Sequence, residues 1–322
     1  MNPNERIKEF VESSFLAPLL KKEGVTDISF NGVDLFYEDN HHGRKKANVH
    51  VDSSKVGDFL RQIANLAEKQ FSYLNSVLDV SFSHYRLNAV FLSIGRVYDQ
   101  KVYTFSLRIC HEGSAISQDP SFFKGKSKKI LLDALARRES IVIAGETGSG
   151  KTELQKYLLL HLPPATRVIV IDNVEELELS RGDGDLDLTS WRVDERFPDS
   201  SFPFLIRNAL RNNPDYLLVA EARGEEMLSA LNAVMSGHPL ITTLHAKDIE
   251  AIPHRMARMA QGNEGKLSYD DLLSDVYHHF STVVYLRKVT EEGEVKRFVS
   301  QIGVLNEKEM KVDIVFSVEA SS

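Results

Sequence analysis

The sequence contains a single cysteine and no long run of apolar residues. Because Cys110 is the only thiol among 322 residues, an internal disulfide and a zinc site built from several cysteines are both excluded. No apolar stretch reaches the roughly 18 residues of a membrane-spanning helix. Residues 1–15 mix charges of both signs, unlike a signal peptide. We therefore expect a soluble protein in a reducing compartment, the cytoplasm, with at most peripheral membrane contact.

An excess of basic residues is also absent. The chain has 39 Lys and Arg against 46 Asp and Glu, a formal net charge of −7. Proteins that coat nucleic acid are usually basic, because neutralising phosphates supplies most non-specific affinity. The composition thus predicts no direct nucleic-acid partner. A local run of lysines is either a contact for lipid or nucleic acid or a solvated linker face: Lys124, Lys126, Lys128 and Lys129.

The hydrophobic pattern divides the chain into three parts. Residues 1–111 mix short alternating strands with an amphipathic helix, which predicts a smaller N-terminal α+β domain. Residues 112–127 lose this periodicity and gather Gly, Ser, Pro and Lys, as a linker does. In residues 128–322, helices alternate with short, β-branched strands. This rhythm is typical of an α/β domain whose parallel sheet is covered on both faces.

One segment matches the phosphate-loop pattern G-x-x-x-x-G-K-[ST]. It follows an apolar strand and opens a helix, which is the context that the motif requires. The glycines let successive backbone N–H groups point at phosphate oxygens. The lysine is expected to bridge the β- and γ-phosphates of ATP, and the threonine hydroxyl to ligate Mg²⁺. The segment comprises Gly145, Glu146, Thr147, Gly148, Ser149, Gly150, Lys151 and Thr152.

Two further apolar strands end in acidic residues. The strand "VIVIDN" ends at Asp172 and is followed by Glu175 and Glu176, and the strand "YLLVAEAR" ends at Glu221 and Arg223. A bound nucleotide explains these acids, because Mg²⁺ needs oxygen ligands or anchored waters and the attacking water must be oriented.

The order of these blocks resembles the hexameric ATPases of type II and type IV secretion, pilus assembly and conjugation. That family carries a Walker A loop, an Asp box, a Walker B strand ending in Gly-Glu-x-Arg, and a His box. The corresponding segments here are "GETGSGKT", "VIVIDNVEEL", "YLLVAEAR" and "SGHPLITTLHA". The resemblance extends into the N-terminal part, through "VTDISFNG", "YRLNAV" and "FSLRIC". It implies a RecA-like fold for residues 128–322.

The resemblance also implies roles for individual residues. Glu221 would face the Mg²⁺–phosphate cluster, and an acid of the Asp box, Asp172 or Glu176, would polarise the attacking water. The histidines of the His box, His245 and His238, would contact the γ-phosphate region, although a histidine beside a strand is also often a hydrogen-bonded structural group.

Several arginines have two interpretations each. Arg86 and Arg108 match arginines that reach the phosphates from the N-terminal domain in the family, which is the favoured interpretation; the alternative is that they are ordinary strand-face charges. Arg207 and Arg211 share one face of a helix and either bridge subunits or pair with surface acids. Arg223 follows Glu221 closely and is a further candidate arginine near the phosphates.

The match departs from the family in two places. The Asp box usually begins Glu-Asp, whereas this chain has Asp172-Asn173, and Asn173 cannot act as a base. Hydrolysis is therefore expected to be slow or to use another base. A four-cysteine zinc insert, found in many pilus-extension and type II relatives, is absent, which favours the conjugation and type IV secretion branch.

The sequence thus predicts an ATP-hydrolysing, Mg²⁺-dependent motor of a bacterial secretion, conjugation or pilus-assembly system. The resemblance implies a homohexamer that docks on inner-membrane components at the cytoplasmic face of the membrane. Two alternatives stay open. One is a nucleotide-binding scaffold that hydrolyses little, motivated by the altered Asp box, and the other is a DNA translocase, which the net charge disfavours.

Overall fold

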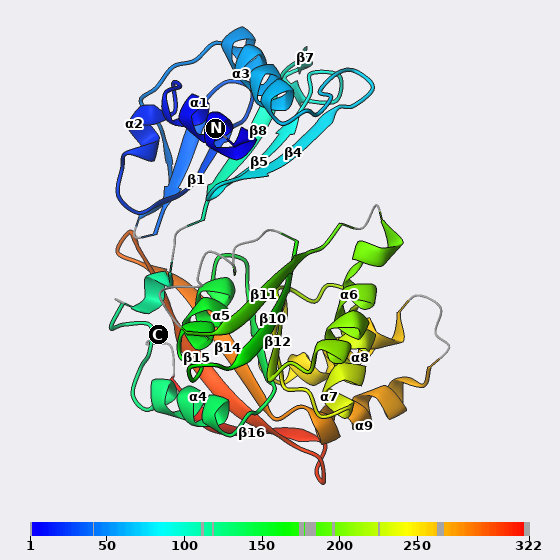
Figure 1. Cartoon of the computed structure of the whole chain (residues 1–322). Helices are drawn as coiled ribbons and strands as arrows, with labels where there is room; N and C mark the ends of the chain where they lie inside the picture. Colours follow the sequence, from blue (N-terminus) through cyan, green and yellow to red (C-terminus); the bar gives the residue numbers. More distant parts are fainter. Residues whose placement is uncertain are drawn as a thin grey trace. The chain divides into compact units, whose positions relative to one another are not determined.

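The computed structural model describes residues 2–40, 42–110, 113–117, 119–173, 177, 185–194, 197–224, 226–262 and 267–318 (Figure 1). The chain forms two compact units. The first comprises Met1–His111 and the short segment Thr290–Val295, and the second comprises Glu112–Val289 and Lys296–Ser322. Residues 112–127 therefore group with the second unit.

The first unit is an antiparallel sheet with helices on one face. The six strands follow the order β3-β2-β1-β8-β5-β4, and a separate hairpin is formed by β6 and β7. The strands are β1 (Val25–Phe30), β2 (Leu35–Asp39), β3 (Gly43–Lys46), β4 (Val77–Phe82), β5 (Tyr85–Val90), β6 (Arg96–Val97), β7 (Gln100–Lys101) and β8 (Thr104–Ile109). The helices are α1 (Pro3–Glu12), α2 (Ala17–Leu20) and α3 (Ser53–Leu66).

Alternating residues explain which face of this sheet is covered. In β5 and β8 every second side chain is buried, including Leu87 and Leu107, while the intervening residues are more exposed and, except for Val90, polar. The buried set packs against Ile7 of α1 and Leu60 of α3 in one hydrophobic core. The opposite face carries polar and charged side chains such as Arg86, as expected for an antiparallel sheet with one covered face.

The second unit contains an eight-stranded, mostly parallel sheet in the order β11-β10-β12-β13-β9-β14-β15-β16. The pairs from β11 to β14 are parallel, and β15 with β16 is antiparallel. The strands are β9 (Ile141–Gly145), β10 (Arg167–Asp172), β11 (Asp187–Arg192), β12 (Tyr216–Val219), β13 (Leu240–Leu244), β14 (Thr282–Glu291), β15 (Glu294–Asn306) and β16 (Lys311–Ser317). The helices are η1 (Ala115–Ser117), α4 (Ser127–Ala136), α5 (Lys151–Leu160), η3 (Pro198–Ser200), α6 (Phe202–Ala209), η4 (Leu210–Asn212), α7 (Glu226–Met235), α8 (Ala251–Gln261) and α9 (Tyr269–His279).

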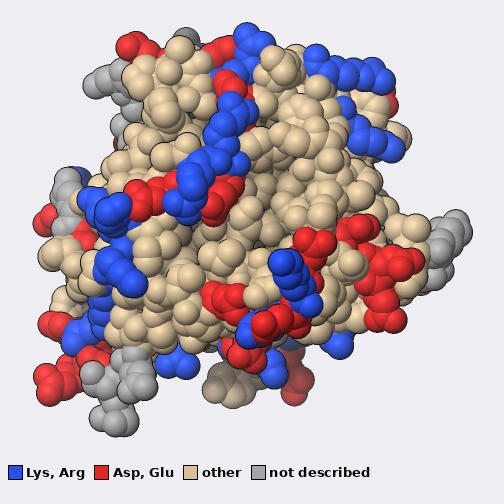
Figure 2. Space-filling view, turned by 90° about the horizontal axis from the view of Figure 1, so that it is seen from below, with Lys and Arg blue, Asp and Glu red and all other residues tan. Residues whose placement is uncertain are grey.

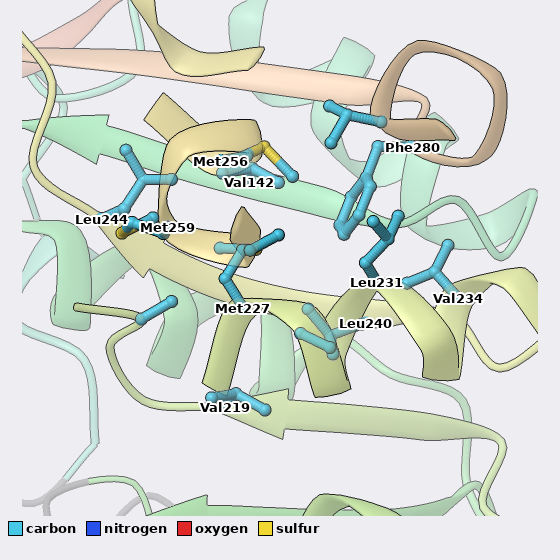
Figure 3. Packing of buried hydrophobic residues seen from close by; sticks show 14 of the residues in the cluster. Val142, Val219, Met227, Leu231, Val234, Leu240, Leu244, Met256, Met259 and Phe280 are labelled. Atoms are coloured by element: carbon cyan, nitrogen blue, oxygen red, sulfur yellow. The ribbon is translucent and has the colours of Figure 1, made fainter. Parts of the chain in front are cut away.

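Helices cover both faces of this sheet, which is why its central strands are apolar throughout. All residues of β9, β12 and β13 are buried. One core contains side chains of α4 and α5, and the other contains side chains of α6 to α9. Figure 3 shows part of the second core, where residues of α7, of α8 and Phe280 lie against strand residues: Val142, Val219, Met227, Leu231, Val234, Leu240, Leu244, Met256 and Met259. The three-layer arrangement confirms the predicted α/β, RecA-like fold.

Charged residues of both signs occur on the face shown in Figure 2. Lys and Arg lie next to Asp and Glu in several places, and uncharged surface extends between these mixed groups. This face therefore presents no broad area of one sign. Within the described part of the chain, none of the helices combines the length and the apolar character needed to cross a membrane.

Candidate functional site

The phosphate-loop segment connects the buried strand β9 to the helix α5. Gly148 and Gly150 have left-handed backbone conformations, with φ of +75° and +95°, which favour glycine. At Gly145 a side chain is excluded for a different reason, because a Cβ there would lie 2.7 Å from the carbonyl oxygen of Leu286. The glycines of the motif are thus required by the geometry of the loop and by its contact with β14.

Lys151 begins α5 and points back into the loop. Its Nζ donates hydrogen bonds to the carbonyl oxygens of Gly145, at 3.1 Å, and Glu146, at 3.0 Å. The residue is only 9% exposed. Burial lowers the pKa of Lys151 to about 8, although the negative charges of Glu221 and Glu146 oppose this shift. Burial of the charged Lys151 ammonium therefore costs free energy in the absence of a bound anion.

Glu221 lies just beyond β12, near Lys151. Its carboxylate accepts a hydrogen bond from Arg223 Nη2 at 2.8 Å, and its other oxygen lies 3.1 Å from His245 Nε2. Burial opposes ionisation of Glu221, but the hydrogen bond from Arg223 and the positive charges nearby outweigh it and lower its pKa. Glu221 is thus an ionised carboxylate at neutral pH.

His245 connects Lys151 to Glu221. Its Nδ1 lies 3.4 Å from Lys151 Nζ, and its Nε2 faces Glu221. Because an ammonium only donates, these partners assign Nδ1 as the acceptor and Nε2–H as the donor. The chain therefore places a lysine, a histidine, a carboxylate and Arg223 in one hydrogen-bonded sequence beside the loop.

Buried polar contacts support the turn that carries Glu221. Gln155, fully buried on α5, donates from Nε2 to the carbonyl of Val219 at 2.9 Å. The Oγ1 of Thr243 donates to the carbonyl of Ala220 at 2.8 Å. These bonds link α5, β12 and β13 at one edge of the sheet. Gln155 belongs to no motif, so nothing in the sequence indicated these contacts.

Asp172 ends β10, the strand beside β12, and is 1% exposed. One oxygen of its carboxylate accepts a hydrogen bond from the backbone N–H of Leu177 at 3.3 Å. Asp172 and Glu221 follow neighbouring parallel strands and therefore share the edge of the sheet that carries the loop. Glu176, the other acid predicted for this box, lies outside the described residues.

The two histidines of the His box lie at opposite ends of β13. His245 follows the strand and reaches Glu221, whereas His238 precedes it and contacts Ser236 Oγ through Nδ1 at 3.1 Å. Five strand residues at about 3.3 Å each separate the two positions by roughly 16 Å. The structure therefore brings His245, and not His238, to the loop of its own chain.

Arg86 and Arg108 belong to the first unit, where they are direct cross-strand partners on β5 and β8. Arg86 forms an ion pair with Asp79 at 3.4 Å, and Arg108 with Asp27 at 3.3 Å. Both lie on the polar face of the sheet. Their local setting is thus that of strand-face charges with acidic neighbours.

The remaining predicted arginines differ in their surroundings. Arg223 contacts Glu221, as described above. Arg207 on α6 and Arg211 on η4 are exposed, and among the described residues neither side chain has a hydrogen-bond or ion-pair partner. Pairing with surface acids within the described chain, one of the two sequence interpretations, is therefore not observed.

Two cations that no motif indicated lie at the loop. Arg297 on β15 donates a hydrogen bond from Nε to the carbonyl of Gly148 at 2.7 Å. Lys288 on β14 approaches the same glycine, because a Cβ on Gly148 would lie 3.4 Å from Lys288 Nζ. Both strands follow the loop by more than a hundred residues, so sequence spacing gave no signal.

Several features of the loop favour the binding of phosphate groups. The glycine loop leads into the N-terminus of α5, whose partial positive charge favours phosphate. The buried hydroxyl of Ser149 has no hydrogen-bond partner among the described residues, so it is available to a ligand. The described residues include no cluster of three or more His, Cys, Asp or Glu that could cage a metal.

Comparisons with known proteins give the family. The model of the family described as "Type II/IV secretion system protein" matches residues 100–276, more than half of the chain. An uncharacterised Bacillus anthracis protein is 28% identical over 297 residues, which cover 88% of this chain and 64% of that protein. A putative conjugal transfer protein of Mycobacterium tuberculosis is 26% identical over 320 residues, covering 95% and 88%. The type IV secretion system protein VirB11 of Brucella suis is 33% identical over 184 residues, covering 55% and 50%.

Solved structures share the fold. The Legionella pneumophila ATPase DotB aligns with a TM-score of 0.65 and 22% identity, covering 95% of this chain and 81% of that one. The pilus retraction motor PilT with bound ADP aligns with a TM-score of 0.61 and 18% identity, covering 99% and 84%. At these identities the likeness shows the fold alone. The match to the family model is what identifies the chain, which belongs to the type II/IV secretion system protein family.

Proposed function

We propose that this chain hydrolyses ATP with Mg²⁺ at Gly145–Thr152 and works as a motor of a secretion, conjugation or pilus-assembly system. The observation that carries the proposal is the convergence of Lys151, His245 and an ionised Glu221 beside a glycine loop. The family match and the DotB and PilT folds, whose proteins are an ATPase and a pilus motor, support it.

Each residue has a defined part in this proposal. The loop N–H groups and the N-terminus of α5 bind phosphate oxygens, and Lys151 exchanges the carbonyls of Gly145 and Glu146 for the β- and γ-phosphates. The Thr152 hydroxyl and the Glu221 carboxylate would hold Mg²⁺. When bound, Mg²⁺ neutralises charge that develops on the phosphates.

Glu221 is the carboxylate best suited to orient the attacking water. Arg223 keeps it ionised, and His245 fixes one of its oxygens. His245 also contacts Lys151, so movement of Lys151 onto phosphates removes one partner of the imidazole. We propose that this link makes His245 sensitive to the γ-phosphate. Asp172 has a supporting part, because its carboxylate accepts a hydrogen bond from the backbone N–H of Leu177.

The motor proposal includes assembly with further copies of the chain. The family resemblance implies a homohexamer made of an N-terminal domain (residues 1–111), a linker (112–127) and the ATPase domain (128–322), at the cytoplasmic face of the inner membrane. Arg207 and Arg211 are exposed and available to a neighbouring copy. Two adjacent loops of the first unit also expose apolar side chains, Leu74 and Tyr98 each being 94% exposed. Such surfaces are often covered in an assembly.

A steady-state phosphate-release assay with purified protein and MgATP tests the proposal. We expect turnover that Lys151→Ala abolishes, and a change in sedimentation when MgATP is added. Background turnover combined with tight nucleotide binding would favour the scaffold alternative. One observation favours that alternative: the acid of the altered Asp box is engaged with Leu177. Absence of nucleotide binding would reject both.

A further inference from the structure

We propose that Arg297 and Lys288, from β15 and β14, form a basic clamp on the phosphate loop and are part of the nucleotide site. Arg297 positions the loop, and both residues add positive charge close to it. This inference rests on the proposed function, because it concerns the same ligand, the triphosphate of ATP.

The hydrogen bond from Arg297 fixes the direction of one loop peptide. Its Nε donates to the carbonyl of Gly148 at 2.7 Å. In a trans peptide the carbonyl and the following N–H point in opposite directions. The N–H of Ser149 therefore points away from Arg297 and into the loop, where it now reaches the carbonyl of Glu146 over a long 3.3 Å. An N–H held in this direction is ready to bind a phosphate oxygen.

Arg297 is itself held firmly. The next residue, Phe298, is buried, and the following N–H, of Val299, donates to the carbonyl of Phe122 at 2.9 Å. Phe122 in turn contacts the loop, because a Cβ on Gly150 would lie 3.2 Å from its ring. The strand that carries Arg297 is thus fixed to the same loop at a second point. This second contact holds the Arg297 guanidinium in position.

Lys288 reaches the loop from the other strand of the hairpin. β14 pairs in parallel with β9, with Leu286 opposite Gly145, and then continues past the end of β9. Lys288 lies two residues beyond Leu286, on the same side of the strand. Its Nζ comes close to Gly148, the glycine that Arg297 contacts. Two cations from two strands therefore converge on one residue of the loop, Gly148.

The test measures nucleotide affinity by titration with a fluorescent ATP analogue in Mg²⁺. Because hydrogen bonds to charged groups are the strong ones, Arg297→Ala is expected to weaken binding about tenfold or more. Arg297→Lys, which keeps the charge and a donor, should recover most of this loss. Arg287→Ala is the matched control, since Arg287 is exposed and adjacent to Lys288 but points to the opposite side of β14. It should leave affinity unchanged.

Competition with magnesium pyrophosphate separates a phosphate-side role from a general structural one. If the clamp acts on the phosphates, Arg297→Ala weakens pyrophosphate binding by the same factor as ATP binding. A loss confined to ATP, or an affinity within twofold of wild type, would overturn the inference. Should Arg297→Ala not fold, Lys288→Met provides the test, with an expected loss of about threefold that grows at low salt. Unchanged affinity there would also overturn it.

The wild-type titration distinguishes the two levels of the proposal. If wild-type protein binds the analogue and the clamp variants bind it equally well, only the clamp is rejected and the ATPase proposal stands. If wild-type protein does not bind at all, the proposed function fails and the clamp falls with it.

Discussion

Replacing Lys151 by methionine should stabilise the nucleotide-free protein while it abolishes nucleotide binding. Burial lowers the pKa of Lys151 from 10.5 to about 8. A shift of about 2.5 units, at about 1.4 kcal/mol each, means that the buried ammonium costs about 3 kcal/mol at neutral pH. The two hydrogen bonds from Lys151 to the loop carbonyls offset about 1 kcal/mol each of this cost. We therefore expect Lys151→Met to raise the free energy of unfolding by about 1 kcal/mol at pH 7.

The pH dependence gives this prediction a second signature. The folded pKa of Lys151 lies below the unfolded one, so between about pH 8 and pH 10.5 the unfolded chain binds more protons. The stability contributed at this position therefore rises with pH across that window. The free energy of unfolding of the wild type should therefore approach that of Lys151→Met as the pH rises. The difference between the two proteins should shrink or reverse by pH 9.5.

Urea denaturation followed by tryptophan fluorescence is a suitable assay. The only tryptophan, Trp191, lies on β11 and reports on the unit that contains the loop. Lys308→Met, at an exposed lysine of the same unit, is the control and should change stability little. A non-hydrolysable MgATP analogue at 100 times its Kd should add about 2.7 kcal/mol to wild type and nothing to Lys151→Met. Destabilisation of Lys151→Met at pH 7, with a difference independent of pH, would refute the reasoning.

Substitutions at four other residues give further predictions. Glu221→Gln should lower phosphate release at least about 100-fold and leave binding of MgATP intact, because it removes the water-orienting charge and keeps the shape; turnover near wild type would argue against this role. Asp172→Ala should lower the free energy of unfolding by about 1–3 kcal/mol, because the N–H of Leu177 loses its acceptor; Asp172→Asn keeps an acceptor and is the control in denaturation. Arg86→Ala and Arg108→Ala should each change the free energy of unfolding by less than about 1 kcal/mol, since exposed ion pairs contribute little; a phosphate-release assay of the same two variants tests the phosphate-side role that the family resemblance implies for them.

Much of the architecture of the second unit could be predicted from the sequence alone. Strand-helix alternation indicated the parallel sheet, because buried strands need continuous apolar residues. The loop from Gly145 to Thr152 was recognisable because its conformation demands glycine at fixed spacing, and the ends of apolar strands marked Asp172 and Glu221. These features follow from local rules that act within a few residues.

Tertiary structure decided which groups meet. His238 and His245 are close in sequence, but β13 runs between them, so they lie at opposite ends of this strand. Arg297 and Lys288 are distant in sequence, yet the pairing of β14 with β9 places them at the loop. Strand order and long-range packing fix these contacts, and no spacing along the chain encodes them. The sequence by itself therefore determined the phosphate loop and the sheet, while only the folded chain determined which cations and carboxylates surround the loop.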